Sequence, residues 1–234
     1  MKTIQKTELT PKEKTPSKSF KICGVEFAYL ALLGIIFAFI GWIAENSAKI
    51  VISGSFDSRF HILPFIGIYA VIPFAFHIVF GSPDSIAVLG KKLFKIKSKK
   101  TVILSNIITY FSICAAVFLG ELAVGNAWDF FFGVKLWNYN NLPLHLTQYT
   151  SVVSTFGFGT GAYLLFKFMC IPLIKVFQRK VPIKVAQWIV MTLGVLIMLD
   201  MLRMIISTAI LGEAPNFWKV KLFLNISMLY NSFY

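Results

Sequence analysis

Long apolar runs alternate with short polar segments along this chain, and the alternation predicts its architecture. A helix that crosses a bilayer needs about 20 predominantly apolar residues, and five runs are of roughly that length. The pattern predicts an all-α, polytopic integral membrane bundle of five transmembrane helices, or six if the C-terminal segment also spans. The five runs cover residues 25–48, 62–80, 102–124, 149–173 and 185–211.

The charged residues between the runs predict the orientation of the bundle. Cytoplasmic connections of membrane proteins are enriched in Lys and Arg. Here the N-terminal tail and the second and fourth connections hold six, six and four Lys or Arg residues, whereas the first connection has only Arg59 after Lys49 at the edge of the first run, and the third has only Lys135. The N-terminus should therefore be cytoplasmic, and the first and third connections should face outward. The formal net charge of +13 then reflects orientation in a membrane and not a nucleic-acid partner.

The two polar ends of the chain lie outside the predicted bundle. Residues 1–23 are rich in Lys, Glu, Thr, Pro and Ser, which predicts a disordered, basic cytoplasmic tail. The apolar run after this tail is longer than the core of a secretory signal, so we expect no signal peptide. Residues 24–212 form the predicted transmembrane helical domain. Residues 213–234 predict a segment that lies at the interface or is partly inserted.

Four ionisable residues lie within or at the edges of the predicted spans. At 1.5 Å per residue, Glu45 and Glu121 each lie roughly 30 Å from the inner start of their spans, at the outer boundary. Asp200 lies about 22 Å from the start of the last span, and Arg203 is one turn higher, so these two can pair. A charge inside a membrane costs at least a few kcal/mol and normally faces a partner within the bundle.

These four residues support two interpretations. In the first, they lock the helices together through ion pairs. In the second, they line a polar pocket that opens outward, with Asp129 on the same side. Lys49, one turn after Glu45, could neutralise that carboxylate locally, which weakens the second interpretation.

The third connection, residues 128–148, combines aromatic and polar residues. Trp and Tyr favour the headgroup region of a bilayer, and Pro143 interrupts regular structure. The segment is either an interfacial loop with an aromatic belt or a re-entrant cap over the pocket, since irregular backbone at membrane depth must be satisfied by protein or water. The candidate pocket residues are Glu45, Glu121, Asp129, Trp137, Tyr139, His145, Asp200 and Arg203.

No recognisable catalytic or nucleotide-binding motif occurs in the sequence. GxxxxGK[ST], GxSxG and HExxH are all absent. The three cysteines are widely spaced and no CxxC occurs, which argues against a disulfide framework or a zinc site. We therefore predict no catalytic residue, no metal, no cofactor and no nucleic-acid partner. The expected partners are the lipid bilayer and a second copy of the chain, because Gly157 and Gly161 have the spacing that lets helices approach closely.

Three phrases of the sequence, taken in order, carry a family resemblance. The first is "GWIAEN", at the end of the first run. The second is "DSRFHILPFIGIYA", and the third begins at Glu121 and ends with "LWNYNNLPLHLTQ". In this order and spacing they resemble the phrases of a family of small bacterial membrane proteins, the putative ABC-transporter type IV or CmpB-like permeases. The resemblance covers residues 41–161 and the Asp of the last run.

Individual positions show both agreement with the family pattern and departures from it. The second phrase has Leu63 and Ala70 where the family has glycines and Gly67 where it has proline. The third has Asn138, His145 and Gln148 where the family has Asp, Asn and Gly, in that order. The chain is therefore expected to be a divergent member. The matching positions are Phe60, Pro64, Ile68, Tyr69, Glu121, Gly125, Trp137, Tyr139, Pro143 and Leu146, with Asp129 in place of the family's second acid.

The resemblance implies a permease-like integral membrane protein, and the charged residues of the spans add the outward-facing polar pocket. If the protein works as an ABC-type permease, its ATPase must be a separate chain. The residues themselves leave two other classes open. One is a membrane-embedded enzyme acting on a lipid or isoprenoid, with Glu45 or Glu121 as acid or base. The other is a non-catalytic assembly or regulatory membrane protein.

Overall fold

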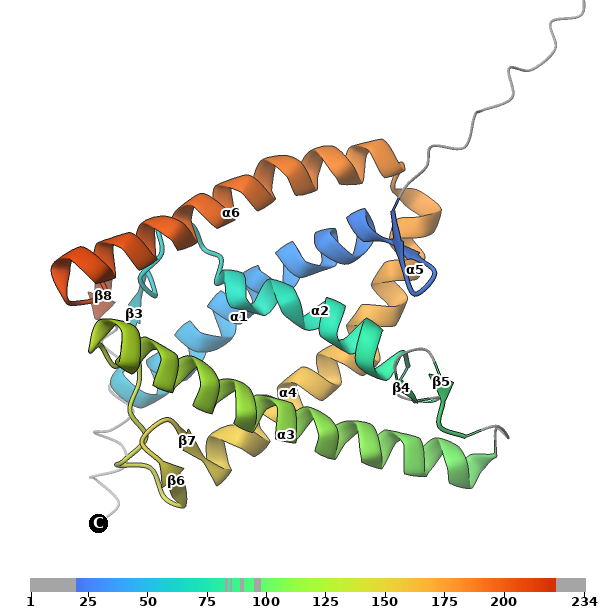
Figure 1. Ribbon diagram of the computed structural model, residues 1–234, viewed down its shortest axis with the longest axis horizontal. Helices are drawn as coiled ribbons and strands as arrows, with labels where there is room; N and C mark the ends of the chain where they lie inside the picture. The colour runs from blue at the N-terminus through green and yellow to red at the C-terminus, as the bar shows by residue number, and fades with distance from the viewer. Residues whose placement is uncertain (1–19, 83, 85, 89–90, 95–97, 222–234) are drawn as a thin grey trace, which may run out of the picture.

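Four long apolar helical segments dominate the computed structural model (Figure 1). The structure describes residues 20–221 except 83, 85, 89–90 and 95–97, so most of the predicted tail and residues 222–234 lie outside the described residues. Each of the four segments is long and apolar enough to cross a membrane. They are α1 (Phe27–Ser53), α3 (Lys99–Phe132), the continuous run Val152–Lys180 and α6 (Ile183–Leu211).

The run at residues 62–80 folds differently from the other four predicted spans. Its helical part is a 3-10 helix, η1 (Gly67–Val71), followed by α2 (Ile72–Ala75) and the π-helical turn η2 (Phe76–Phe80). This part rises by roughly 20 Å, short of the roughly 30 Å of hydrocarbon in a bilayer. The five residues before η1 are not helical, because the chain there is bound through its backbone to other elements. The structure thus has four candidate spans and one shorter apolar helix, where the pattern predicted five spans.

Local sequence explains where the long helices begin and end. α3 and α4 (Val152–Leu165) start with capping boxes, in which a serine and the residue three positions later satisfy each other's free backbone N–H groups. α1, α3 and α6 each end at a glycine in the left-handed conformation, which a residue with a Cβ rarely adopts. These glycines are Gly54, Gly133 and Gly212.

A π-helical turn interrupts the fourth segment. α4 continues through η3 (Phe166–Cys170) into α5 (Ile171–Lys180), and Pro172 lies in the first turn of α5. Proline has no backbone N–H and cannot form the i→i−4 bond of a helix interior. The change of hydrogen-bond pattern just before Pro172 is therefore explained by the sequence. Such turns reorient side chains relative to a regular helix.

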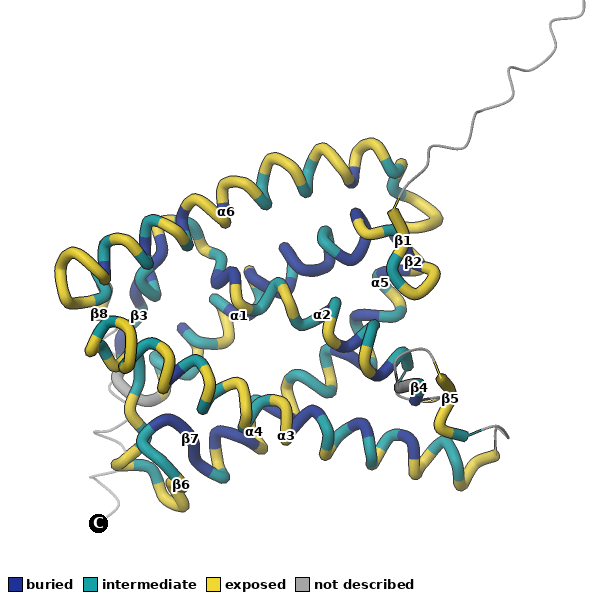
Figure 2. Tube along the Cα trace, viewed as in Figure 1, coloured by how far each residue is buried: buried dark blue, intermediate teal, exposed yellow. Residues whose placement is uncertain are grey.

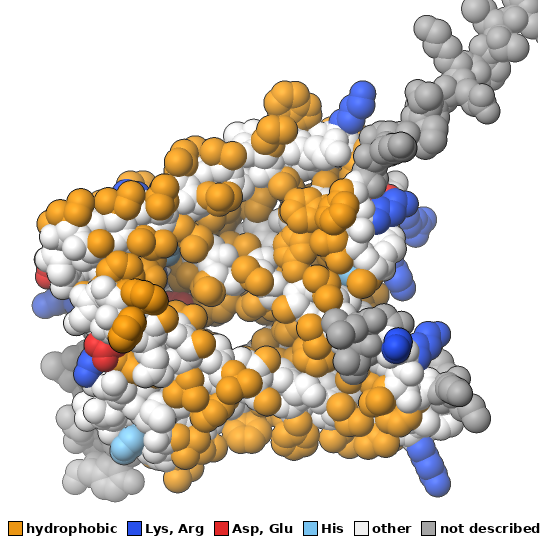
Figure 3. Space-filling model, viewed as in Figure 1, with side chains coloured by type: hydrophobic (Ala, Val, Ile, Leu, Met, Phe, Trp, Pro, Cys, Tyr) orange, Lys and Arg blue, Asp and Glu red, His pale blue; other side chains and the backbone are white. Residues whose placement is uncertain are grey.

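The helices form two packed groups. α1 packs against η1, α2, α5 and α6, whereas α3 packs mainly against α4. Figure 2 shows the buried residues concentrated on α1 and its neighbours, with much of α3 and α6 exposed. Leu30 and Leu33 of α1 and Phe166 of η3 are among the most buried side chains of the core. Figure 3 shows a hollow between α3 and the helices above it.

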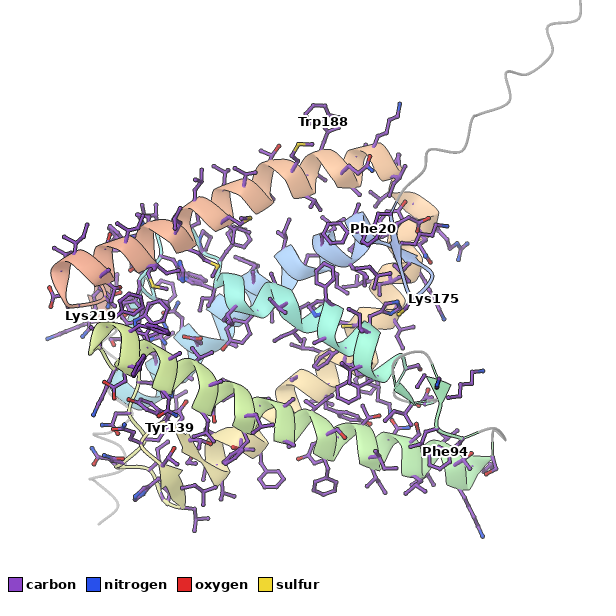
Figure 4. The ribbon with its side chains drawn as sticks, viewed as in Figure 1. Phe20, Phe94, Tyr139, Lys175, Trp188 and Lys219 are labelled. Atoms are coloured by element: carbon purple, nitrogen blue, oxygen red, sulfur yellow. The ribbon has the colours of Figure 1, made fainter. Side chains whose placement is uncertain are left out.

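The two ends of the bundle differ in charge. Most Lys and Arg side chains visible in Figure 3 lie at one end, which we call the basic end. In Figure 4, Phe94 and Lys175 lie at this end, and Tyr139 and Lys219 lie at the opposite one. The opposite end, which we call the carboxylate end, contains the last turns of α1, α3 and α6. α3 runs from the basic end to the carboxylate end, and α4 returns.

Four short antiparallel strand pairs connect these helices. One of them, β3 with β8, ties the beginning of the C-terminal segment to the end of α1. Residues 213–221 are therefore held against the bundle in the described structure. The pairs are β1 (Lys21–Ile22) with β2 (Val25–Glu26), β3 (Ser55–Asp57) with β8 (Lys219–Lys221), β4 (Ala87–Val88) with β5 (Lys91–Lys92), and β6 (His145–Thr147) with β7 (Thr150–Ser151).

Candidate functional site

The carboxylate end contains two polar clusters. The first, called the α1–α6 cluster, consists of Glu45, Asp57, His61 and Asp200 with the cations that bind them. The second, called the α3–α4 cluster, consists of Glu121 and Asp129 with the hydroxyl groups that bind them. The sequence predicted a single pocket, and the structure distributes its residues between these two clusters.

Asp200 anchors the connection between β3 and η1 to α6. Its carboxylate accepts the backbone N–H of Ile62 at 3.0 Å and that of Leu63 at 3.1 Å. Arg203, one turn later, donates through Nε to Asp200 at 2.9 Å and through Nη2 to the Phe60 carbonyl at 2.7 Å. A buried carboxylate with this many donors is well compensated. The predicted pairing of Asp200 with Arg203 is therefore present.

Asp57 organises the end of α1. Its side chain is fully buried and forms an ion pair with Lys49. It also accepts hydrogen bonds from the backbone N–H of Arg59 at 3.0 Å and from Asn216 Nδ2 at 3.1 Å. Burial alone would raise the pKa of the Asp57 carboxyl, but the bonds from Lys49 and Arg59 outweigh it, so this pKa lies below its ordinary value. The sequence suggested Lys49 as a partner of Glu45, and the structure pairs it with Asp57 instead.

Glu45 is paired with Arg59. Two nitrogens of the guanidinium group, Nε and Nη2, donate to Glu45 Oε2, with Nε at 2.8 Å. The other carboxylate oxygen accepts from the Tyr69 hydroxyl at 2.9 Å. Arg59 and Phe60 both have positive φ, at 52° and 68°. This uncommon backbone geometry turns the chain so that Arg59 reaches Glu45 while the Phe60 carbonyl reaches Arg203.

His61 is the least satisfied member of the α1–α6 cluster. It is 3% exposed, and its Nδ1 lies 3.4 Å from Asp200 Oδ2 without a well-formed hydrogen bond. Burial lowers the pKa of His61 below 6.5, although the nearby Asp200 carboxylate opposes the shift. The imidazole is therefore held in its neutral form near pH 7.

Glu121 has a different environment from the acids on α1 and α6. Its Oε2 accepts from Ser154 Oγ at 3.0 Å and its Oε1 from the Tyr139 hydroxyl at 3.4 Å. Within the part of the chain that the structure describes, no Lys or Arg nitrogen lies within 4 Å of it. Glu121 is thus held by neutral hydroxyl groups from the third connection and the start of α4.

Asp129, two turns after Glu121, accepts a hydrogen bond from the Tyr149 hydroxyl. Tyr149 is almost fully buried, and its burial together with the Asp129 carboxylate raises its pKa to about 12. The Tyr149 ring lies directly against Gly125, where a Cβ would come within 2.4 Å of ring carbon Cγ. Trp137 donates through Nε1 to the Tyr149 carbonyl at 2.9 Å. Gly125 therefore allows the third connection to fold back onto α3.

The two clusters approach each other through two tyrosines. Burial raises the pKa of Tyr139, and the Glu121 carboxylate and the more distant Glu45 carboxylate raise it further. Tyr69, bound to Glu45, and Tyr139, bound to Glu121, also influence each other electrostatically. The carboxylates on α1 and on α3 therefore influence the same tyrosine, although the two helices belong to different packed groups.

Six of the eight predicted pocket residues belong to these clusters, and a seventh, Trp137, borders the α3–α4 cluster by donating to the Tyr149 carbonyl. The exception is His145, which is exposed and bonds through Nδ1 to the Leu142 carbonyl at 3.2 Å. Arg59, Asp57 and Tyr69 were not among the predicted pocket residues, yet each binds or forms part of the α1–α6 cluster. A signal existed for Arg59, since it is the only basic residue between the first two apolar runs after Lys49.

Other predictions concern the glycines and the possible ligands. Nothing lies within 4 Å of a Cβ built on Gly157 or Gly161, whereas Gly159 makes the close contact, with Cys114 of α3. Among the described residues, no group of three or more His, Cys, Asp and Glu side chains is placed to hold a metal ion. Two cavities of about 510 Å³ lie away from both clusters, one beside Ser98 on α3 and one between α1 and α6 near Phe27.

The fold and the polar end together define a helical membrane protein. Four helices are long and apolar enough to cross a bilayer, and their paired charges lie at helix ends and between helices. The chain belongs to the family described as putative ABC-transporter type IV, whose sequence model matches residues 32–205. The match covers both polar clusters and confirms the predicted family. The comparison with curated proteins found no match, and neither did the comparison with solved structures.

Proposed function

We propose that this chain is the membrane-embedded subunit of a transporter, with ATP hydrolysis supplied by a separate chain. Family membership supports an ABC-transporter-related role. The sequence contains no GxxxxGK[ST] phosphate-binding loop, so an ATPase would have to be another protein. In this proposal α1, α3, the α4–α5 run and α6 span the membrane, the basic end is cytoplasmic and the carboxylate end faces outward.

The substrate-binding part of this site is the α3–α4 cluster. The observation that carries this assignment is the Glu121 carboxylate, which the described residues bind only through hydroxyl groups. An ionisable group in a membrane span normally has a charged partner or a functional role. Among the described residues Glu121 has no charged partner, so a functional role is the better explanation. A carboxylate beside the ring of Tyr139 suits a substrate that carries a positive charge, such as an amine or quaternary ammonium group.

The α1–α6 cluster has the opposite character and supports a structural role. Its acids are matched by Lys49, Arg59 and Arg203. Adding a cationic substrate there would require breaking an existing pair. We therefore assign it to holding the connection between β3 and η1, which places Tyr69 beside the substrate site.

The test uses a deletion strain and a panel of cationic antimicrobial amphiphiles and amines. We expect the strain to show altered growth with at least one compound, and wild-type protein to restore it. Glu121→Gln should not restore growth although it is expressed at the wild-type level, whereas Glu121→Asp should restore it in part. Glu213→Gln, an exposed acid at the same end of the bundle, is the matched control and should restore growth fully. Full complementation by Glu121→Gln would reject the assigned site.

The partner ATPase needs its own experiment. Purified chain in nanodiscs should raise the ATPase rate of a nucleotide-binding protein that co-purifies with it, and the same ATPase with empty nanodiscs is the control. An ATPase rate that is identical in both cases would reject the two-chain transporter while leaving the binding role of Glu121 to be judged by complementation.

A further inference from the structure

Lys167 is a basic residue inside the fourth apolar segment. It lies in the π-helical turn η3, within the continuous helical run Val152–Lys180. Its Nζ donates to Asn106 Oδ1 of α3 at 2.8 Å and lies 3.4 Å from the Tyr163 hydroxyl. Tyr163 also donates to the same Asn106 oxygen, at 2.6 Å. This contact joins α3 and α4 near the basic end, far from both carboxylate clusters.

The charge of Lys167 is not balanced directly. In the described structure no Asp or Glu oxygen lies within 4 Å of its ammonium group. Asp84 binds the other side of the Asn106 amide, Nδ2, at 3.0 Å. An ammonium group has three donor hydrogens, and among the described residues it bonds to two neutral oxygens. Lys167 can therefore still donate to an anion, and Asp84 supplies one nearby negative charge among several positive ones.

A concave surface lies on α3 just beyond this contact. A cavity of about 510 Å³ is lined by Ser98, Lys99, Val102 and Ile103. Lys99, Ile103 and Asn106 are spaced by four and three residues, so they share one face of α3. Lys99 lies about 10 Å from Asn106 along the helix axis. The cavity is polar at the start of the helix and apolar in the next turn.

We propose that Lys167 and Lys99 bind the phosphate group of an anionic phospholipid, with one acyl chain against Val102 and Ile103. The flexible four-carbon stems of the two lysines allow both ammonium groups to reach one phosphate. Basic pockets between membrane helices commonly bind anionic headgroups. A phosphate group is present both in a phospholipid headgroup and in free inorganic phosphate, so both could bind these lysines. The lipid is favoured because two of the four cavity-lining side chains are apolar and would contact nothing in a site for inorganic phosphate. This inference rests on the α3–α4 contact and not on the transport proposal.

The experiment measures lipid retention by native mass spectrometry of the full chain in detergent. Dioleoylphosphatidylglycerol and dioleoylphosphatidylcholine are added in turn. We expect the wild type to retain phosphatidylglycerol at least fivefold more than phosphatidylcholine. Lys167→Gln should abolish that preference and Lys167→Arg should keep it. Lys175→Gln is the matched control, because Lys175 is an exposed lysine on the same helical run at the same end.

Each of the following results would count against the proposed lipid site. An equal loss in Lys175→Gln would show that the charge of the whole basic end attracts the lipid, without a defined site. If inorganic phosphate at millimolar concentration raises the Tm of the wild type and displaces the lipid while Lys167→Gln does neither, the ligand is a free phosphate and the lipid assignment is wrong. If Lys167→Gln does not fold, Lys99→Gln replaces it and should lower retention at least twofold; an unchanged value would overturn the proposal.

Discussion

The two carboxylate clusters lie at the same end of the bundle but handle charge in opposite ways. In the α1–α6 cluster, Asp200 has Arg203 and Glu45 has Arg59. In the α3–α4 cluster, the described residues bind Glu121 with hydroxyl groups of Ser154 and Tyr139 and provide no cation within 4 Å. An acidic residue that is already paired with a basic residue holds parts of the structure together. An acid held in place by neutral donors remains able to bind a cation from outside.

The elements around the clusters match this difference. The α1–α6 cluster joins the better-packed group of helices, and it fixes an irregular segment whose backbone N–H groups need acceptors. The α3–α4 cluster lies on the helix pair that has few other neighbours. Removing charges should therefore lower stability in the first cluster, and should change function more than stability in the second.

The largest expected effect is that of Arg203→Leu. Removing one partner of a buried ion pair leaves the other charge uncompensated and costs about 3–5 kcal/mol, whereas removing both is often nearly neutral. We expect a clear drop in Tm in detergent for Arg203→Leu, and partial recovery on adding Asp200→Asn. Adding Glu121→Gln to Arg203→Leu should not restore stability. Recovery by Glu121→Gln would mean that the two clusters share their charges and would remove the distinction between them.

Glu45→Gln and Glu121→Gln test the contrast directly, because the same change is made at the carboxylate end of two different helices, α1 and α3. Glu45→Gln breaks the Arg59 pair, and hydrogen bonds to charged groups contribute about 1.5–3 kcal/mol. Glu121→Gln loses no ion pair in the described structure and should lower the free energy of unfolding by under about 1 kcal/mol. The measurement is the Tm of both purified variants. Equal losses would show that Glu121 is as much a structural residue as Glu45.

Gly125→Ala tests whether the close contact with Tyr149 supports the α3–α4 cluster. A Cβ there would lie within 3 Å of three Tyr149 atoms, so the ring or helix must shift, which typically costs about 1–3 kcal/mol. Gly157→Ala is the control, because nothing lies within 4 Å of its Cβ position and alanine favours the helix. We expect a lower Tm for Gly125→Ala and an unchanged or higher one for Gly157→Ala. A drop for Gly157→Ala would point to a contact with another chain at that face.

The smallest effect is the pH dependence from His61. The pKa of His61 in the folded protein lies below 6.5. As the pH falls, this imidazole therefore binds a proton in the unfolded chain before it does so in the folded protein. The free energy of unfolding should therefore fall from about pH 6.5 downward, until the folded imidazole also protonates. Asp57 has a lowered pKa too, but its contribution is lost as the pH falls from about 4, the ordinary pKa of an Asp, through its lower folded pKa, which is below the range measured here.

The Tm between pH 7.5 and 5 measures this dependence. His61→Gln should flatten the profile, and His145→Gln, which alters an exposed histidine, should leave it as in the wild type. A slope that persists in His61→Gln would assign the acid sensitivity to another group.

Local sequence was enough to predict the long helices and the polar character of the carboxylate end. Serine caps, terminal glycines and apolar runs act within a few residues of one another, so they are visible without a fold. The run at residues 62–80 was predicted as a span because its composition is apolar. Pairing across more than 130 residues, between Asp200 and the backbone of Ile62 and Leu63, keeps its first part out of a helix.

The sequence by itself determined the family, the apolar helices and the charged residues inside or beside them, because each depends on composition and on spacing along the chain. Only the tertiary structure decided which acid meets which base. Lys49 is one helical turn from Glu45 and yet binds Asp57, and Glu45 instead binds Arg59. These choices depend on the left-handed backbone at Arg59 and Phe60 and on the close approach of separate helices. This geometry depends on packing between distant parts of the chain, so it cannot be predicted from local sequence patterns.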